Sequence, residues 1–236
     1  MSEYPSSWPL SLHDAAQVRA LDARLMAAGT PGAVLMQRAA QAAWRALRRR
    51  WPQLRKLCVL AGPGNNGGDG YLLAAIARRA GWDVQVYSLA DPARLRDAAA
   101  QAYAEACAQG VQMQPWHAEA VLDGLLVDAM LGTGLAGELR EPYASAVARI
   151  NASGLPCLAL DIPSGLCADT GRLWGAAVRA DLTVTFIALK LGLFTGAGPD
   201  QVGELCFADL QADAALCAAA PAMAQRLTAG NLQRLP

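Results

Sequence analysis

Short apolar runs alternate with amphipathic stretches along most of the chain. The runs that predict strands are Leu57–Ala61, Val84–Leu89, Leu125–Met130, Cys157–Leu160, Leu182–Ala188 and Glu204–Phe207. The stretches between them predict helices over Gly70–Ala80, Ala93–Gln109 and Pro142–Asn151. Strands that alternate with helices are typical of α/β proteins. We therefore expect a doubly wound, mostly parallel sheet with helices on both faces.

Two helical stretches precede the first of these strands. Apolar residues recur at helical spacing in the first stretch, at Val18, Leu21, Leu25 and Met26. Ser11 is expected to cap that helix, because a serine hydroxyl can accept a hydrogen bond from a free backbone N–H of the first turn. The second helix is expected to have Thr30 as its N-cap and Pro31 at its first position, and to run to Trp51.

The composition narrows the class of partner. The 236 residues suit one α/β domain, and 20 basic residues balance 20 acidic ones, so neither nucleic acid nor an anionic membrane surface is favoured. No apolar run approaches the roughly 20 residues of a membrane-spanning helix. Met1–Leu12 lacks the pattern of a secretory signal, so a cytoplasmic location is expected. The six cysteines form no CxxC pair and are expected to be reduced, and two histidines give little support to a zinc site or a Ser–His–Asp triad.

A glycine-rich segment follows the first predicted strand, at the edge where ligands bind in open parallel sheets. Gly62–Gly70 fits the GxGxxG spacing of dinucleotide-binding turns, a pattern that also fits an NAD(P)-dependent oxidoreductase. Asp69 differs from such a turn, because its carboxylate would repel a pyrophosphate at the start of the next helix. The segment is interpreted as a ligand loop that offers Asn65, Asn66 and Asp69. The alternative is that Asp69 only caps the helix and the asparagines only shape a turn.

Polar residues follow the later strands as well. Asp128 lies near the end of the third strand, and the glycine-rich segment Gly132–Glu138 comes directly after it. Asp161 follows the fourth strand beside the rigid turn Pro163–Gly165, and Lys190, one of two lysines in the chain, follows the fifth. Carboxyl ends of parallel strands meet at one edge, so these groups are interpreted as parts of one site. Turn-capping aspartates and a surface lysine with a buried stem are the alternatives.

Taken together, these segments closely resemble the NAD(P)H-hydrate epimerase family, also called the YjeF N-terminal domain. The matching stretches are GPGNNGGDG at Gly62–Gly70, VDAMLGTGLAGELREP at Val127–Pro142, DIPSG at Asp161–Gly165 and the stretch Gly171–Gly198. The resemblance runs from about Ala15 to Leu210. It implies a Rossmann-like fold and an isomerase that interconverts the R and S hydrates of NADH and NADPH, which is a repair reaction.

The resemblance also implies roles for individual residues. It implies substrate contacts at Asn65, Asn66, Gly67, Gly68, Asp69, Gly132, Thr133, Gly134, Leu135, Ala136, Gly137, Glu138 and Asp161. It implies a potassium ion at Asn66, Asp128 and Ser164, whose oxygen atoms suit a hard cation. Asp161 is expected to transfer protons and stabilise a cationic intermediate, and Lys190 to hold a phosphate or help to place water. No redox cofactor is expected, because the hydrated dinucleotide NAD(P)HX is itself the substrate.

The resemblance bears on domains and partners too. Residues 1–210 are expected to form the epimerase domain and residues 211–236 a terminal helix, tail or linker. Residues 227–236 resemble the entry to the ADP- or ATP-dependent NAD(P)H-hydrate dehydratase domain of bifunctional members, and a homodimer is expected because the family is often dimeric. Two alternatives stay open. One is a non-catalytic binding module of the same fold, and the other is the oxidoreductase, for which neither Asp83 nor Asp91 lies cleanly at the end of the second strand.

Overall fold

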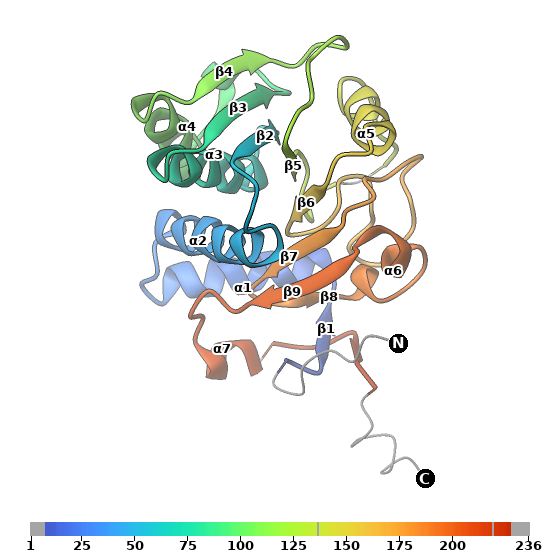
Figure 1. The fold of residues 1–236 in the computed structure, drawn as a ribbon. Helices are drawn as coiled ribbons and strands as arrows, with labels where there is room; N and C mark the ends of the chain where they lie inside the picture. The colour runs from blue at the N-terminus through green and yellow to red at the C-terminus, as the bar shows by residue number, and fades with distance from the viewer. Residues whose placement is uncertain (1–7, 136, 219, 228–236) are drawn as a thin grey trace.

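The centre of the computed structural model, which describes residues 8–227 except 136 and 219, is a parallel sheet (Figure 1). In the described residues it has seven strands in the order β4-β3-β2-β5-β6-β7-β9. The strands are β2 (Lys56–Ala61), β3 (Asp83–Ser88), β4 (Gln112–Pro115), β5 (Leu125–Ala129), β6 (Cys157–Leu160), β7 (Leu182–Phe186) and β9 (Glu204–Ala208). Each neighbouring pair is parallel, so the carboxyl ends of all seven strands lie at one edge. The predicted α/β class with a mostly parallel sheet is confirmed.

Helices cover both faces of this sheet. They are α1 (Ala15–Ala27), α2 (Gly32–Arg50), α3 (Asn65–Arg79), α4 (Asp97–Ala108), α5 (Tyr143–Ala152), α6 (Gly198–Gln201) and α7 (Ala214–Ala218). Leu57 and Val59 of β2 pack in the same apolar cluster as α2, α3 and α4, whereas Cys58 and Leu60 pack with α5. Successive side chains of a strand point to opposite faces, so a continuous apolar run supplies both layers. None of the described helices is both long and apolar enough to cross a membrane.

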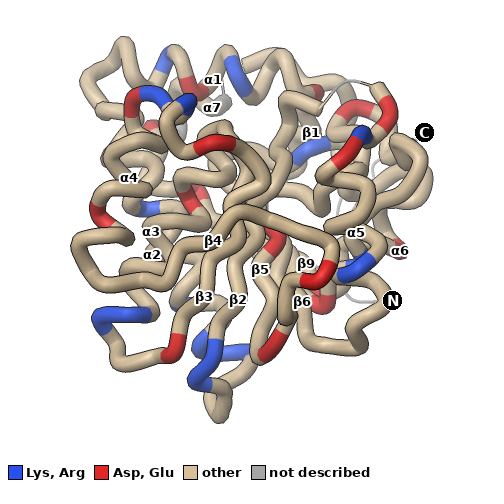
Figure 2. Tube along the Cα trace, turned by 90° about the horizontal axis from the view of Figure 1, so that it is seen from above, with Lys and Arg blue, Asp and Glu red and all other residues tan. Residues whose placement is uncertain are grey.

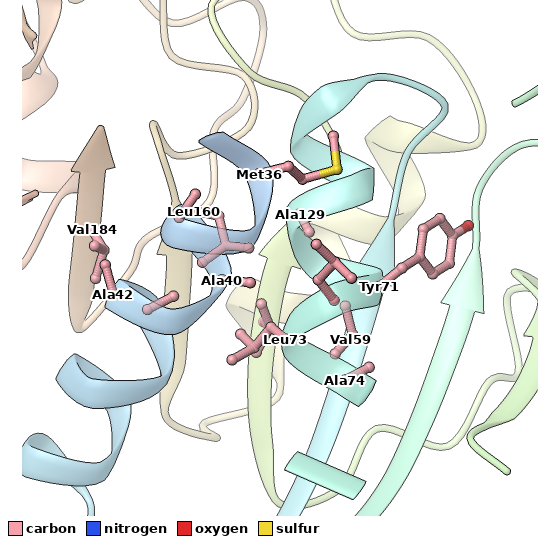
Figure 3. Packing of buried hydrophobic residues seen from close by; sticks show 14 of the residues in the cluster. Met36, Ala40, Ala42, Val59, Tyr71, Leu73, Ala74, Ala129, Leu160 and Val184 are labelled. Atoms are coloured by element: carbon pink, nitrogen blue, oxygen red, sulfur yellow. The ribbon is translucent and has the colours of Figure 1, made fainter. Parts of the chain in front are cut away.

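Small residues let α2 and α3 lie close to each other and to the sheet (Figure 3). Ala40 of α2 is fully buried and lies near Leu160 of β6. Leu73 of α3 is also fully buried and lies beside Ala40. A Cβ atom on Gly70 would come within 2.5 Å of the Cβ atom of Ala129 on β5. The absence of side-chain atoms at Gly70 therefore sets how closely α3 approaches the middle of the sheet.

A second, small sheet joins distant parts of the chain. It contains β10 (Ala224–Gln225), β1 (Ser11–His13) and β8 (Leu189–Lys190) in that order. β1 pairs with β8 in parallel and with β10 in antiparallel orientation. The described part of the predicted tail thus contains α7 and then a strand that pairs with the beginning of the chain. The domain boundary at residue 210 itself stays a prediction.

Several predicted helix starts were wrong. Ser11 lies in β1, and Asp14 caps α1 instead, because its carboxylate accepts the backbone N–H of Gln17 at 2.7 Å and the Gln17 side chain accepts the N–H of Asp14. Pro31 is the N-cap of α2 rather than its first residue, which leaves Thr30 outside the helix. A 3₁₀ turn, Pro92–Arg94, interrupts the predicted fourth helix, so α4 begins at Asp97 and not at Ala93.

Acidic and basic residues are interspersed along the chain, as Figure 2 shows in a view from above. Many exposed charges pair locally, such as Lys56 with Asp123 at 2.7 Å and Arg79 with Glu105 at 2.7 Å. Such exposed pairs contribute little to stability, since solvent screens them.

Candidate active site

A cavity of about 950 Å³ opens at the carboxyl edge of the parallel sheet. Helix α1, the first turns of α2, α3 and α4, and the segments that follow β5, β6 and β7 all contribute to its walls. Nine residues predicted for the site line it: Asn65, Asn66, Asp69, Gly132, Thr133, Gly134, Leu135, Asp161 and Lys190. The structure therefore brings together groups from four separate segments of the chain.

The predicted glycine loop is not a loop but the beginning of α3. The helix starts at Asn65 with Gly64 as its N-cap, five residues before the predicted start at Gly70. A Cβ atom on Gly67 would lie 2.0 Å from the carbonyl oxygen of Gly62, and one on Gly68 would lie 2.5 Å from Cε of Met36. These two glycines permit tight packing and do not line the cavity, in contrast to the predicted substrate contacts.

Asp69 lies in the second turn of α3 and faces the cavity from a buried position. It does not cap the helix, because Gly64 occupies that place. Burial raises the pKa of the Asp69 carboxyl well above its usual value, and the neighbouring Asp161 and Asp22 raise it further. The backbone N–H groups that can favour an anionic group lie one turn earlier, at the N-terminus of α3 that begins with Asn65.

Asn66, Asp128 and Ser164 form a buried cluster beside the cavity. The hydroxyl of Ser164 donates to Asp128 Oδ1 at 2.6 Å and its backbone N–H donates to Asp128 Oδ2 at 2.7 Å. The backbone N–H of Leu131 donates to Ser164 Oγ at 2.9 Å, and Asn66 Nδ2 donates to the Leu131 carbonyl at 3.0 Å. Burial raises the pKa of Asp128 to about 6, although the hydrogen bonds from Ser164 and Met130 act in the opposite direction.

The donor set of this cluster fits a hard cation. Asn66 Oδ1 is buried and accepts no hydrogen bond from the described residues. A buried amide oxygen without a partner is rare and indicates a missing ligand or water. Amide, hydroxyl and carboxylate oxygens are donors that hard cations prefer. In the described part of the chain no three His, Cys, Asp or Glu side chains form a metal-binding group, so a cation here would depend on Asn66 and Ser164.

Asp161 and Lys190 form an ion pair at the inner wall of the cavity. Lys190 is fully buried, and its ammonium group donates to Asp161 Oδ1, to Thr185 Oγ1 at 2.9 Å and to the carbonyl of Phe186 at 2.9 Å. Three acceptors match the three donors of an ammonium group. Lys190 is therefore fixed as the partner of Asp161, which leaves no free donor for the phosphate contact expected from the sequence.

The backbone around Asp161 is strained. Asp161 has φ 66° and Ile187 has φ 65°, which is the left-handed region that residues with a Cβ atom rarely adopt. The Asp161 N–H donates to the carbonyl of Val184 at 2.8 Å, and the Phe186 N–H donates to Asp161 Oδ1 at 3.3 Å. Such strain persists where the surroundings impose it and is common at functional sites. Asp161 Oδ1 is thus held by two donors, and Oδ2 lies on the side of Gly132, 3.8 Å from where a Cβ atom of that residue would be.

The cavity also contains residues that the sequence did not single out. Asp22 and Arg19 of α1 line it, as do Asp97 and Gln101 of α4. Arg19 reaches across to the segment after β5 and donates to the carbonyl of Thr133 at 3.4 Å. Asp22 could have been found, because it lies four residues after Val18 and four before Met26, on a helix face that otherwise reads as apolar.

In the segment after β5, two more of the predicted substrate contacts do not line the cavity, and one lies outside the described residues. Glu138 is exposed and Gly137 is half-buried, and neither belongs to the cavity walls. Ala136 lies outside the described residues. Of this segment, residues 132–135 line the cavity, and the substrate contacts themselves stay a prediction.

Comparisons with known proteins agree on the kind of domain. The family model described as YjeF-related protein N-terminus matches residues 32–192. The bifunctional NAD(P)H-hydrate repair enzyme of Coxiella burnetii is 44% identical over 196 residues, which are 82% of this chain and 40% of that protein. The NAD(P)H-hydrate epimerase of Limosilactobacillus fermentum is 37% identical over 83% of this chain and 94% of its own length. The crystal structure of the yeast protein ynu0 superposes with a TM-score of 0.70 at 22% identity, covering 82% of this chain and 86% of that one, and so supports the fold.

The chain spans less than half of several relatives that it matches. It covers 40% of the Coxiella protein and 32% of the bifunctional NAD(P)H-hydrate repair enzyme of Leishmania major, to which it is 42% identical. Those matches thus concern one part of longer proteins. The match to the Limosilactobacillus protein covers nearly the whole of that relative.

Proposed function

The chain belongs to the family described as YjeF-related protein N-terminus, and we propose that it is an NAD(P)H-hydrate epimerase, an isomerase that interconverts the R and S forms of hydrated NADH and NADPH at C6. The observation that carries the proposal is the buried Asp161–Lys190 pair on the wall of a cavity of about 950 Å³. Cavities of roughly 300–1,000 Å³ are typical of small-molecule sites. Relatives named as epimerases and as bifunctional repair enzymes support the same activity.

The proposed reaction suits a carboxylate that is held rigidly. C6 of the hydrate carries a hydroxyl group next to the ring nitrogen, so loss of water with help from the nitrogen lone pair gives a planar iminium cation. Water can then add to either face. Asp161 would stabilise the cation and transfer protons, and proton transfer of this kind contributes about 100- to 10,000-fold. Lys190 holds Oδ1 of Asp161 in place, so the cavity side of the carboxylate needs no reorganisation during the reaction.

The cavity walls supply groups for binding the dinucleotide. The N-terminus of α3 and the segment 132–135 bring backbone groups to the cavity walls, and the diphosphate of the substrate would lie against them. Asn65 and Arg19 also line the cavity and carry side-chain donors. We propose that this end of the cavity binds the diphosphate and that the end with Asp161 receives the hydrated ring. No redox cofactor is needed, since the dinucleotide is the substrate.

We also propose that Asn66, Asp128 and Ser164 hold a potassium ion. The orphaned Asn66 Oδ1 and the hard oxygen atoms of the cluster support this assignment. A bound potassium ion would supply positive charge beside the cavity and connect α3 to the segments after β5 and β6. With one carboxylate among the donors, the cluster suits a weakly held monovalent ion better than magnesium.

The test of the epimerase is a direct assay. We would add the protein to R-NADPHX in potassium buffer and follow the S form by chromatography, against a blank without enzyme, because the two hydrates also interconvert spontaneously. Acceleration well above the blank that is lost in Asp161→Asn would establish the activity. Folded, potassium-loaded protein that gives no acceleration would contradict it and leave a binding module of the same fold.

Other features of the proposed enzyme rest on its relatives. Several of them are named bifunctional, and we propose that this domain also acts next to an ADP- or ATP-dependent dehydratase domain where the two are fused. The homodimer and the cytoplasmic location stay predictions from the sequence.

A further inference from the structure

Asp22 is a partly buried carboxyl group of the cavity, and one of its two oxygen atoms has no hydrogen-bond partner among the described residues. It lies on α1 between Val18 and Met26, on the side of the helix that forms one wall of the cavity. Its Oδ1 atom is buried and accepts no hydrogen bond from the described residues. A buried polar atom without a partner costs free energy of folding. A group that has this cost and faces a ligand cavity is a candidate for binding or chemistry.

The surroundings of Asp22 make its carboxyl easier to protonate than an ordinary aspartate. Burial raises the pKa of Asp22 to about 6, the charge on Asp161 raises it further, and Lys190 acts in the opposite direction. The other charged groups on the cavity walls are Asp69, Arg19 and Asp97. Asp161, in contrast, is ion-paired with Lys190. The cavity therefore holds one carboxyl group that readily carries a proton and one that is paired as a carboxylate, which is the arrangement of an acid and a base.

Inversion at C6 places a demand that one fixed carboxyl group does not meet. The departing hydroxyl group must receive a proton on one face of the ring, and the incoming water must lose a proton on the other face. Asp161 is fixed by Lys190 and by strained backbone, so it can serve one face of a bound ring. Asp22 reaches the cavity from α1, a different wall from the strand end that bears Asp161.

Resting on the proposed epimerase function, we propose that Asp22 is the second proton-transfer residue of the site and serves the face of the ring that Asp161 does not. In one direction Asp22 gives its proton to the C6 hydroxyl, the C6–O bond breaks, water leaves, and the nitrogen lone pair forms the C=N bond. Water then adds to the opposite face, the C–O bond forms, and Asp161 takes the proton. The reverse direction uses the same steps in the opposite order.

The scheme requires that the two carboxyl groups exchange their proton between turnovers. After one inversion Asp161 carries the proton and Asp22 does not. Exchange of protons with solvent through the open cavity restores the starting form. In the wild-type protein, the active form in either direction carries a single proton, which lies on Asp22 or on Asp161. We therefore expect kcat/KM to fall at high pH, where this proton is lost. The fall approaches about tenfold per pH unit once Asp22 is ionised.

The test follows inversion and oxygen exchange together. Purified R- and S-NADPHX are each incubated in H₂¹⁸O with wild-type protein, Asp22→Asn or the surface control Asp83→Asn, and the spontaneous rates are subtracted. We expect Asp22→Asn to lower inversion by at least about 100-fold. We also expect it to retain ¹⁸O exchange without inversion in one epimer only, because Asp161 must then act as both acid and base on its own face. Asp83→Asn should behave as wild type.

Each outcome decides the matter. The role of Asp22 is overturned if Asp22→Asn inverts the substrate at a rate within threefold of wild type. It is also overturned if the variant exchanges ¹⁸O into both epimers or into neither. If the variant does not fold, the wild-type pH profile decides, because a kcat/KM that rises steadily from pH 5.5 to 8.5 also overturns it. Wild-type protein that accelerates neither inversion nor exchange contradicts the proposed epimerase itself and so is distinguished from a failure of Asp22.

Discussion

Replacing Lys190 by methionine tests whether the buried ion pair is needed by the fold as well as by the site. Methionine keeps the unbranched stem of lysine but removes the ammonium group. The side chain of Lys190 is 1% exposed and that of Asp161 is 17% exposed, so the variant leaves a carboxylate with little access to water. It also leaves Thr185 Oγ1 and the Phe186 carbonyl without their donor.

The expected cost follows from this burial. Removing one partner of a buried pair typically destabilises a protein by about 3–5 kcal/mol, because the remaining charge is uncompensated. Asp161 keeps some contact with solvent, so we expect about 3 kcal/mol at pH 7.5. Adding Asp161→Asn should recover at least about 1 kcal/mol of that loss, because the double variant no longer buries a charge.

Urea unfolding followed by circular dichroism measures these differences. The matched control is Lys56→Met, which removes the other lysine of the chain, an exposed residue paired with Asp123. We expect little change in the free energy of unfolding for this control. A loss below about 1 kcal/mol in Lys190→Met at pH 7.5, with an unchanged urea slope, would refute the conclusion that the pair is mutually dependent.

Two further predictions concern the groups beside the cavity. Gly67→Ala would place a Cβ atom 2.0 Å from the carbonyl oxygen of Gly62, so we expect the free energy of unfolding in urea to fall by about 1–3 kcal/mol. The control is Gly64→Ala, which has nothing within 4 Å of the added Cβ atom and should be as stable as wild type. Equal stability of the two variants would contradict the packing role of Gly67. Ser164→Ala removes the hydroxyl donor to Asp128 and should lower the free energy of unfolding by about 1–3 kcal/mol. Potassium chloride should raise Tm in the wild type but not in this variant. A variant whose Tm rises with potassium as much as that of the wild type would count against the ion site.

The main sheet could be predicted from the sequence because its strands are buried on both faces. β5 and β7 are buried along their whole length, and such strands read as continuous apolar runs. β4 was missed because it is a polar edge strand, Gln112–Pro115, with little buried surface. The strands of the small sheet have two or three residues each, which is too short for a recognisable pattern.

The predicted start of α3, at Gly70, was wrong because local helix propensity does not include tertiary packing. Asn65–Gly68 contains residues that disfavour helices, so the sequence predicted a loop. In the folded protein the neighbours leave no room for a side chain in this turn, as the 2.0 Å between a Cβ atom on Gly67 and the carbonyl oxygen of Gly62 shows. Tertiary packing thus outweighs propensity. Asp161 and Lys190 were found because each follows a strand, whereas Asp22 lies inside a helix and was identified only by the cavity that it faces.

The small sheet has a consequence for the order in which the chain folds. The strand that bears Lys190 pairs with one side of β1, and β10 pairs with the other side. Just before β10, the Met223 N–H donates to the Leu12 carbonyl at 2.9 Å. Residues 56–208 of the main sheet leave the ribosome before β10 does, so the parallel sheet can form first. Contacts between positions about 200 residues apart close a long loop and form late. We therefore expect the chain to become compact before the site is complete. In a nascent chain the main sheet could be folded while β8, which bears Lys190, still lacks the complete small sheet beside it.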